Sequence, residues 1–164
     1  MRIRWRVFVL SASLAGMAGC SARVQHVTDL PAGVTEAQAK SWDAAVANLH
    51  KISATTTTLR QAVIAARNAG GFPSDEYYAA ALQGIARVDQ IELAAAQMLQ
   101  QQPKAFGQPQ KQQIALYASM ITQEAEKLNA AGATQIKNPD SQQQINALLS
   151  DLANTVKIIL GLAG

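Results

Sequence analysis

Apolar side chains recur every three or four residues over most of the chain beyond residue 34, and this spacing is the strongest constraint on the fold. A helix turns once in 3.6 residues, so side chains at these steps share one face, whereas a half-buried strand needs alternation in twos. No stretch bounded by turn residues shows a convincing alternation in twos. The spacing therefore predicts an all-α fold.

Capping and turn residues divide the pattern into separate helices. Thr35 with Gln38 three residues later forms a capping-box pattern, and Gly70-Gly71 ends the first segment. Ser74 is predicted to cap the second helix, with two acidic residues in its first turn, and Pro103 to stop it. These signals predict two long helices joined by a short link.

Two further helices follow. The third is predicted to begin near Pro109 and to run to Gly132, and the fourth to follow a turn and cap at 138–141 and to end near Gly161. Four such helices with short links predict an antiparallel up-down-up-down bundle over residues 35–164. The predicted core positions are Trp42, Val46, Leu49, Ile52, Thr56, Leu59, Val63, Ala66, Tyr78, Leu82, Ile85, Val88, Ile91, Ala95, Met98, Ile114, Tyr117, Ile121, Ala125, Leu128, Ile145, Leu148, Leu149, Leu152, Val156 and Ile159.

Two segments fit the helical pattern less well. The run Thr55–Thr58 consists of β-branched residues, which lose side-chain freedom in a helix, so a bend or short break is expected there. The glutamine-rich stretch Gln97–Gln113 is polar and uncharged apart from two lysines, and we expect it to form a frayed connection between the second and third helices.

The amino-terminal residues have a different character. Met1–Arg6 is basic, and Val7–Ala18 runs for twelve residues without a charge. Twelve residues make about 18 Å of helix, which is well short of the ~30 Å hydrocarbon core of a bilayer. The segment is therefore interpreted as a secretory signal with a basic start and a short apolar region.

Met17-Ala18-Gly19-Cys20 resembles the lipobox of bacterial lipoprotein precursors, which has a large apolar residue, two small residues and a cysteine. Met17 stands where that family most often has Leu. The resemblance implies that Cys20 receives a diacylglycerol through a thioether, that signal peptidase II cleaves before it, and that the freed amine is acylated. The alternative is an ordinary signal peptide cleaved near Ala18 or Ala22, with Cys20 incidental.

This interpretation divides the chain into three parts. Residues 1–19 are the signal peptide, residues 20–34 carry the lipidated cysteine and a flexible tether, and residues 35–164 form the helical domain. Ser21 follows the cysteine, and the lack of Asp there favours the outer membrane in enterobacterial lipoproteins. The expected location is the bacterial cell envelope, lipid-anchored and facing the periplasm.

Charge and composition argue against several functions. The chain has 164 residues and a formal charge of +3, but three arginines lie in the first 19 residues and the rest carries 11 Lys/Arg and 11 Asp/Glu. A neutral domain lacks the basic patch that nucleic acid requires, so no nucleic-acid partner is expected. A single cysteine excludes an internal disulfide.

No pattern suggests a metal or cofactor. Covalent haem needs Cys-x-x-Cys-His, which is absent, and axial ligands for free haem are limited to His26, His50, Met98 and Met120. His26 lies in the tether, and His50 lies at a helix flank with no second histidine on its face. We expect no cofactor.

The carboxylates also suggest no catalytic site. Asp89 and Glu92 share a helix face, but a solvated face explains this spacing better than a metal or acid–base pair, and the same holds for Glu124, Glu126 and Lys127. No nucleophile elbow or phosphate-binding glycine loop occurs. We therefore expect that the protein is not an enzyme and assign no catalytic or metal-binding residue.

Two aromatic residues are candidate partner contacts. Phe72 and Phe106 lie in links expected at opposite ends of the bundle, and interfaces favour aromatic anchors. The alternative is structural: Phe72 would pack on Tyr78 at the start of the second helix, and Phe106 would plug the other end.

The expected function is that of a membrane-anchored lipoprotein whose helical domain is a binding or structural module. Its expected partners are the membrane, through acyl chains on Cys20, and an envelope protein or cell-wall component. The alternative is a carrier that holds a small apolar ligand between the helices. Excess apolar volume inside the bundle would favour the carrier, whereas a filled core with an exposed apolar surface would favour the binding module.

Lipidation gives the first testable prediction. Intact-mass analysis of the membrane fraction is expected to show a mature chain that begins at Cys20 and carries added acyl mass. Cys20→Ser should accumulate as uncleaved precursor, because signal peptidase II acts on the lipidated cysteine. An unmodified Cys20, or a new amino terminus at Ala22, would contradict the prediction.

Overall fold

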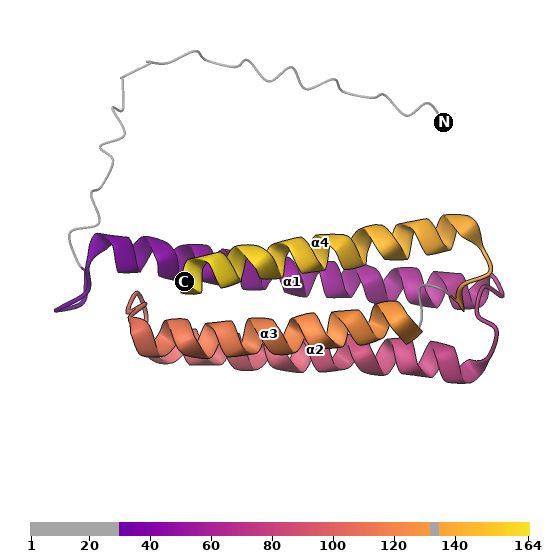
Figure 1. The fold of residues 1–164 in the computed structure, drawn as a ribbon, viewed down its shortest axis with the longest axis horizontal. Coiled ribbons are helices and arrows are strands. Elements are labelled where there is room, and N and C mark those ends of the chain that lie inside the picture. Colours follow the sequence, from indigo (N-terminus) through magenta and orange to yellow (C-terminus); the bar gives the residue numbers. More distant parts are fainter. Residues whose placement is uncertain (1–29, 132–134) are drawn as a thin grey trace, which may run out of the picture.

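The computed structural model describes residues 30–131 and 135–164. These residues form four α-helices and no strand: α1 (Glu36–Asn68), α2 (Asp75–Gln101), α3 (Gln108–Ala131) and α4 (Pro139–Ala163) (Figure 1). Each helix contacts the next one along the chain, and α4 also contacts α1, so the four close a ring. The predicted all-α four-helix bundle is confirmed.

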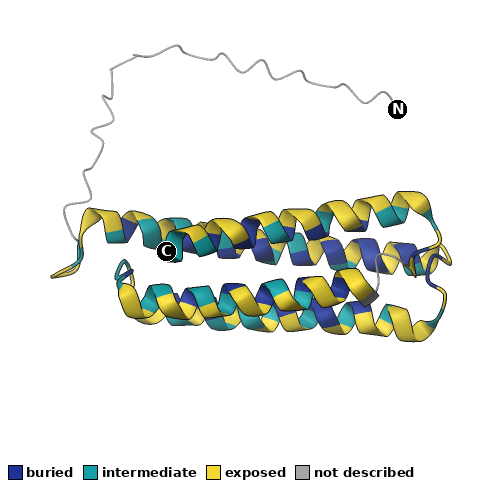
Figure 2. Cartoon of the chain, viewed as in Figure 1, coloured by how far each residue is buried: buried dark blue, intermediate teal, exposed yellow. Residues whose placement is uncertain are grey.

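One apolar core fills the space between the helices. Figure 2 shows buried positions along the inner faces of the helices and exposed positions along their outer faces. Every predicted core position is buried or half-buried. The largest fully buried side chains are Phe106, Ile52, Leu59, Ile85, Leu99, Ile114, Ile121, Leu152 and Ile159.

The predicted capping box at the start of α1 is confirmed. The backbone N–H of Gln38 donates to Thr35 Oγ1 over 3.2 Å, and the backbone N–H of Thr35 donates to Gln38 Oε1 over 2.8 Å. Two amides that the helix leaves without a partner are thereby satisfied.

The backbone N–H groups of the glycine pair close the carboxyl end of α1 by two hydrogen bonds to carbonyls of its last turns. The Gly70 N–H donates to the Arg67 carbonyl over 2.9 Å, and the Gly71 N–H donates to the Ala66 carbonyl over 2.8 Å. This is a Schellman motif, which needs a left-handed residue, and Gly70 has φ +69°. The chain can therefore turn sharply toward α2.

Two helix starts differ in detail from the prediction. Ser74 is the N-cap of α2, but its hydroxyl accepts no capping hydrogen bond and is buried without a partner. The first turn of α2 relies instead on its acidic residues. The fourth helix begins earlier than expected, because Asn138 is its N-cap, accepts from the Ser141 N–H and places Pro139 in the first turn.

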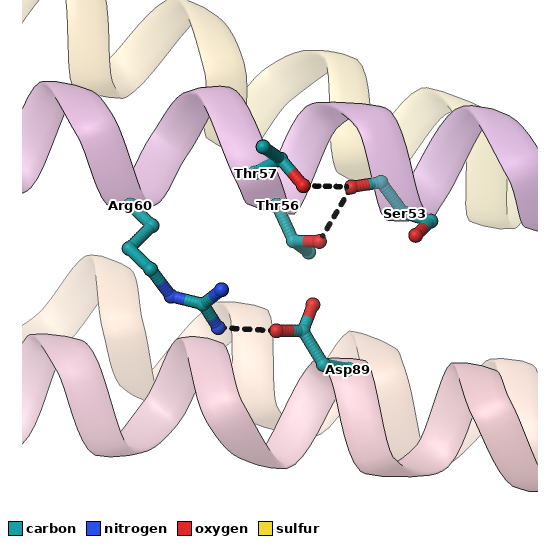
Figure 3. A network of polar contacts seen from close by, with 5 residues as sticks. All are labelled: Ser53, Thr56, Thr57, Arg60 and Asp89. Atoms are coloured by element: carbon teal, nitrogen blue, oxygen red, sulfur yellow. Dashed lines mark hydrogen bonds and ion pairs between the residues drawn. The ribbon is translucent and has the colours of Figure 1, made fainter.

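The expected break in the threonine run does not occur, since α1 continues without interruption to Asn68. The hydroxyls of Thr56 and Thr57 donate to the Ser53 carbonyl over 3.0 and 2.9 Å (Figure 3). Bonds to the preceding turn satisfy these hydroxyls within the helix. Thr56 is therefore tolerated although it is buried.

The glutamine-rich stretch is also more regular than predicted. α2 continues to Gln101 and α3 begins at Gln108, so the connection comprises only residues 102–107. Phe106 anchors the connection in the core, and the Trp42 indole Nε1–H donates to the Leu99 carbonyl over 3.0 Å at the same end. Burial of one aromatic ring thus orders a segment whose composition is polar.

Gly84 allows a close approach between α2 and α3 that the sequence did not reveal. A Cβ atom at this position would lie 2.5 Å from Leu128 Cδ2 and 2.7 Å from its Cγ. Such distances are too short for carbon atoms in contact. The Leu128 side chain therefore occupies the space that a larger residue would need.

We predict that Gly84→Ala destabilises the bundle by about 1–2 kcal/mol, because displacement of Leu128 outweighs the ~1 kcal/mol gain in helix propensity. Gly161→Ala is the matched control, since nothing lies within 4 Å of its added Cβ. The control should stabilise by up to about 1 kcal/mol. Urea unfolding of both variants measures the difference, and equal stabilisation by both would refute the close-approach argument.

Candidate functional site

An open groove of about 680 Å³ lies between α3 and α4. Along α4 it extends from Asn146 to Leu160, which corresponds to about 21 Å at 1.5 Å per residue. Its lining residues are Thr122, Ala125, Glu126, Asn129, Asn146, Leu149, Ser150, Ala153, Val156, Lys157 and Leu160.

The floor of the groove is apolar. Leu149 and Val156 are core residues, and Leu160 is half-buried at one end. Ala125 on α3 and Ala153 on α4 carry only a methyl group. Because small side chains leave the space between two helices unfilled, the seam stays open to solvent.

The banks of the groove are polar. Glu126 and Asn129 come from α3, and Asn146, Ser150 and Lys157 come from α4. All five side chains are exposed, and none has a hydrogen bond or ion pair with the described part of the chain. Their charges cancel, since the groove holds one carboxylate and one ammonium.

The other polar groups that link helices lie elsewhere. Arg60 pairs with Asp89 across α1 and α2 (Figure 3), and the Arg87 guanidinium lies 3.5 Å from Glu124 across α2 and α3. Within residues 30–131 and 135–164, no ion pair joins α3 to α4. The α3–α4 seam is therefore free to accept another group.

The interior of the bundle offers much less room. A cavity beside Leu59, Phe72, Ile85 and Leu128 measures about 10 Å³, which is barely the space of one water molecule. An apolar ligand has no place there. The usable volume lies outside the core, in the groove.

Both candidate partner contacts are buried. Phe72 is 5 % exposed and packs edge-to-face on Tyr78, with ring centroids 5.8 Å apart, and Phe106 is 1 % exposed. Their rings have the structural roles given as the alternative, one at each end of the bundle. Both rings are thus buried in the described structure, and the assignment of Phe72 and Phe106 as partner contacts stays a prediction.

The side chains of Asp89 and Glu92 do not lie on a fully solvated helix face. Both side chains are half-buried at the α1–α2 seam, where Asp89 meets Arg60 and Glu92 lines a small pocket with Trp42 and His50. Burial, together with the negative charge of Asp89, raises the pKa of Glu92, and His50 opposes this shift. The described residues contain no cluster of three His, Cys, Asp or Glu side chains that could hold a metal ion.

Glu124 and Glu126 lie in different surroundings. Lys127 Nζ donates to Glu124 Oε1 over 2.6 Å, and this bond, with the charges of Lys127 and Arg87, lowers the pKa of Glu124. Glu126 instead stands on the bank of the groove. The structure therefore separates residues that the sequence places side by side.

The remaining haem-ligand candidates do not converge. His50 is exposed on α1, Met98 is half-buried on α2, and Met120 is exposed on α3. His26, Cys20 and the residues Met17–Gly19 that were predicted to form a lipobox lie outside the described residues.

The length and hydropathy of α4 meet a criterion used for membrane-spanning helices. It is long and apolar enough to span a bilayer by length and composition, with a mean hydropathy of 1.3 over its most apolar 18 residues. A core helix meets the same criterion, and α4 packs along α1 and α3. Its apolar stripe supplies core side chains such as Leu152 and Ile159.

Sequence reasoning missed the groove. It assigned Ala125 to the core and left Asn146, Ser150, Ala153 and Lys157 unremarked, although these four follow steps of three and four along α4. That spacing of small and polar residues is the signal that marks one wall. The opposite wall is formed by Thr122 to Asn129 on the preceding helix, so the groove itself appears only when the helices pack.

Comparison of the chain with family models, with curated proteins and with solved structures found no match.

The shifted pKa values of Glu124 and Glu92 predict opposite pH effects on stability. The lowered pKa of Glu124 means that its ionised form stabilises the fold above pH ~4.5, and this contribution is lost as the pH falls through the folded pKa. The raised pKa of Glu92 means that its ionised form is penalised in the fold, and this penalty disappears as the pH falls below the folded pKa.

At pH 7, Glu124→Gln should therefore destabilise the bundle and Glu92→Gln should stabilise it, each by no more than about 1 kcal/mol because both carboxyls are only partly buried. The Glu92 difference should disappear as the pH falls below the ordinary value of 4.5, and the Glu124 difference only as the pH falls below the lowered pKa of the folded state. Thermal unfolding of both variants and the parent protein is compared over this range, and shifts of the same sign at pH 7 would contradict the assignment.

Proposed function

We propose that the protein is a bacterial lipoprotein anchored through acyl chains on Cys20, and that its helical domain is a binding module that acts through the α3–α4 groove. The observation that carries this proposal is the contrast between a core with a cavity of about 10 Å³ and an outer groove of about 680 Å³. A domain filled inside and hollowed outside is suited to surface binding.

The anchor rests on the amino-terminal sequence. A basic start, a short apolar region, two small residues and the lone Cys20 occur in the order that lipoprotein precursors have. Two or three acyl chains hold a protein at a bilayer far more firmly than one. With Ser21 after the cysteine, we place the protein at the outer membrane, facing the periplasm.

The groove favours an envelope protein over cell-wall material as the partner. Its floor consists of aliphatic side chains, whereas polysaccharide would need polar groups there. A helix with a row of large apolar residues would set them between α3 and α4, and its polar flanks would meet the unpaired groups on the banks. The balanced charge of the groove argues against nucleic acid.

Catalysis has little support. The groove brings together Glu126, Lys157, two amides and the hydroxyls of Ser150 and Thr122, with no histidine among its lining residues. No nucleophile is paired with a base in this set. Carriage of an apolar ligand inside the bundle is likewise disfavoured by the small volume of the core cavity.

Site-specific crosslinking in living cells tests the proposal. A photo-crosslinking residue at Ser150 or Asn129 should trap a discrete heavier product, because both line the groove. The same residue at Gln90 on α2 is the control, since Gln90 is exposed and outside the groove.

A groove-filling substitution sharpens the test. Ala153→Phe should reduce the Ser150 product at least several-fold, whereas Ala147→Phe, on the exposed surface of α4 outside the groove, should not. Circular dichroism checks that both variants remain helical. Equal trapping at Gln90, or no effect of Ala153→Phe, would show that the groove is not the binding surface.

A further inference from the structure

We infer that the α3–α4 groove is a site for a single alkyl chain, and that its occupant is an acyl chain on the protein's own Cys20 whenever that chain is outside a bilayer. The inference rests on the proposed lipidation and adds a regulatory role to the proposed binding surface. In this state the lipid covers the groove, and insertion of the lipid into a membrane uncovers it.

The dimensions of the groove fit an acyl chain. One leaflet of a bilayer accounts for about half of the ~30 Å hydrocarbon thickness, so one chain extends over roughly 15 Å. The groove follows α4 for about 21 Å from Asn146 to Leu160 and α3 for about 10 Å from Thr122 to Asn129, so a chain would lie between both helices over part of its length and along α4 over the rest. Its volume of about 680 Å³ lies within the range of pockets that enclose small apolar molecules.

The chemistry of the groove also fits. An alkyl chain forms no hydrogen bonds, so it suits the aliphatic floor of Leu149, Ala153, Val156 and Leu160. A thin chain reaches this floor without touching the banks, whose polar groups remain hydrated. A helix, about 10 Å across, would instead rest on the banks and reach the floor only with its side chains.

The position of Cys20 makes the contact feasible. The described chain begins at Leu30, at the end of the bundle where α4 finishes (Figure 1). The groove opens toward that same end at Leu160. Ten residues separate Cys20 from Leu30, and a chain of ten residues spans at most about 36 Å. A lipid on Cys20 can therefore reach the mouth of the groove.

The protein's own lipid is favoured over a free fatty acid for two reasons. The ammonium of Lys157 is balanced by the carboxylate of Glu126, so the groove has no net positive charge to hold a free carboxylate. A tethered chain also has an effective concentration of roughly millimolar, which free lipid in water does not reach. Covalent attachment to the protein, rather than attraction between charges, therefore keeps an acyl chain in the groove.

The lone cysteine allows a direct test on the full-length chain. Purified protein is alkylated at Cys20 with N-hexadecylmaleimide, or with N-ethylmaleimide as the short-chain control, and methyl resonances are compared by NMR. The hexadecyl group should shift the methyl signals of Ala125, Ala153 and Val156, which line the groove, and leave the exposed Ala79 on α2 unchanged.

Three further comparisons test whether the hexadecyl group itself occupies the groove. Ala153→Phe should abolish the shifts at Ala125 and Val156, and Ala147→Phe should retain them. Phosphatidylethanolamine–phosphatidylglycerol vesicles should reverse the shifts by withdrawing the hexadecyl chain. Equimolar free palmitate with ethyl-capped protein should produce no more than about a tenth of the effect, because it lacks the tether.

The outcomes are distinct. If the hexadecyl group does not shift the groove methyl signals, or if the shifts persist in Ala153→Phe, the groove is not a site for an alkyl chain. Equal shifts with free palmitate would overturn the assignment to the protein's own lipid. If the groove shifts are absent while the Ser150 crosslink persists in cells, this inference fails and the proposed function stands. If the crosslink is absent while the groove shifts occur, the proposed binding of a partner in the groove fails and the inference of an alkyl site stands.

Discussion

The fold depends on closing a ring of four apolar stripes around one core. No helix can bury its stripe alone, because each needs two neighbours to cover it. Ile52 on α1, Ile85 on α2, Ile121 on α3 and Leu152 on α4 are all fully buried, one from each helix. The links complete the enclosure, since Phe72 and Phe106 seal opposite ends.

This constraint also explains where the bundle is open. Ion pairs cross both seams of α2, Arg60 with Asp89 and Arg87 with Glu124, and the pockets along these seams measure about 100 and 260 Å³, less than the groove. At the α3–α4 seam, Ala125 and Ala153 face a space that neither fills, and the polar residues on its banks find no partner in the described chain. A groove therefore forms where the core is already complete, so it does not depend on a defect in packing.

The groove and the amino-terminal anchor belong together in this interpretation. The described chain starts at the bundle end where α4 finishes, and the residues that line the groove extend along α4 to Leu160 (Figure 1). A domain held near a bilayer at that end would present the groove close to the membrane surface. Lipid insertion and partner binding then become linked events, because one groove serves both.

The sequence alone determined the number of helices, the inward face of each and most of their ends. These features depend on residues within a few turns of one another, as in the Thr35 capping box and the Gly70-Gly71 turn. Local patterns failed where the deciding partner is distant. Phe106 orders a polar link by entering the core, and Gly84 matters because Leu128 lies against it. Only the tertiary structure decided that Phe72 and Phe106 are buried and that α3 and α4 leave a groove, because each depends on side chains that meet only after the helices have packed.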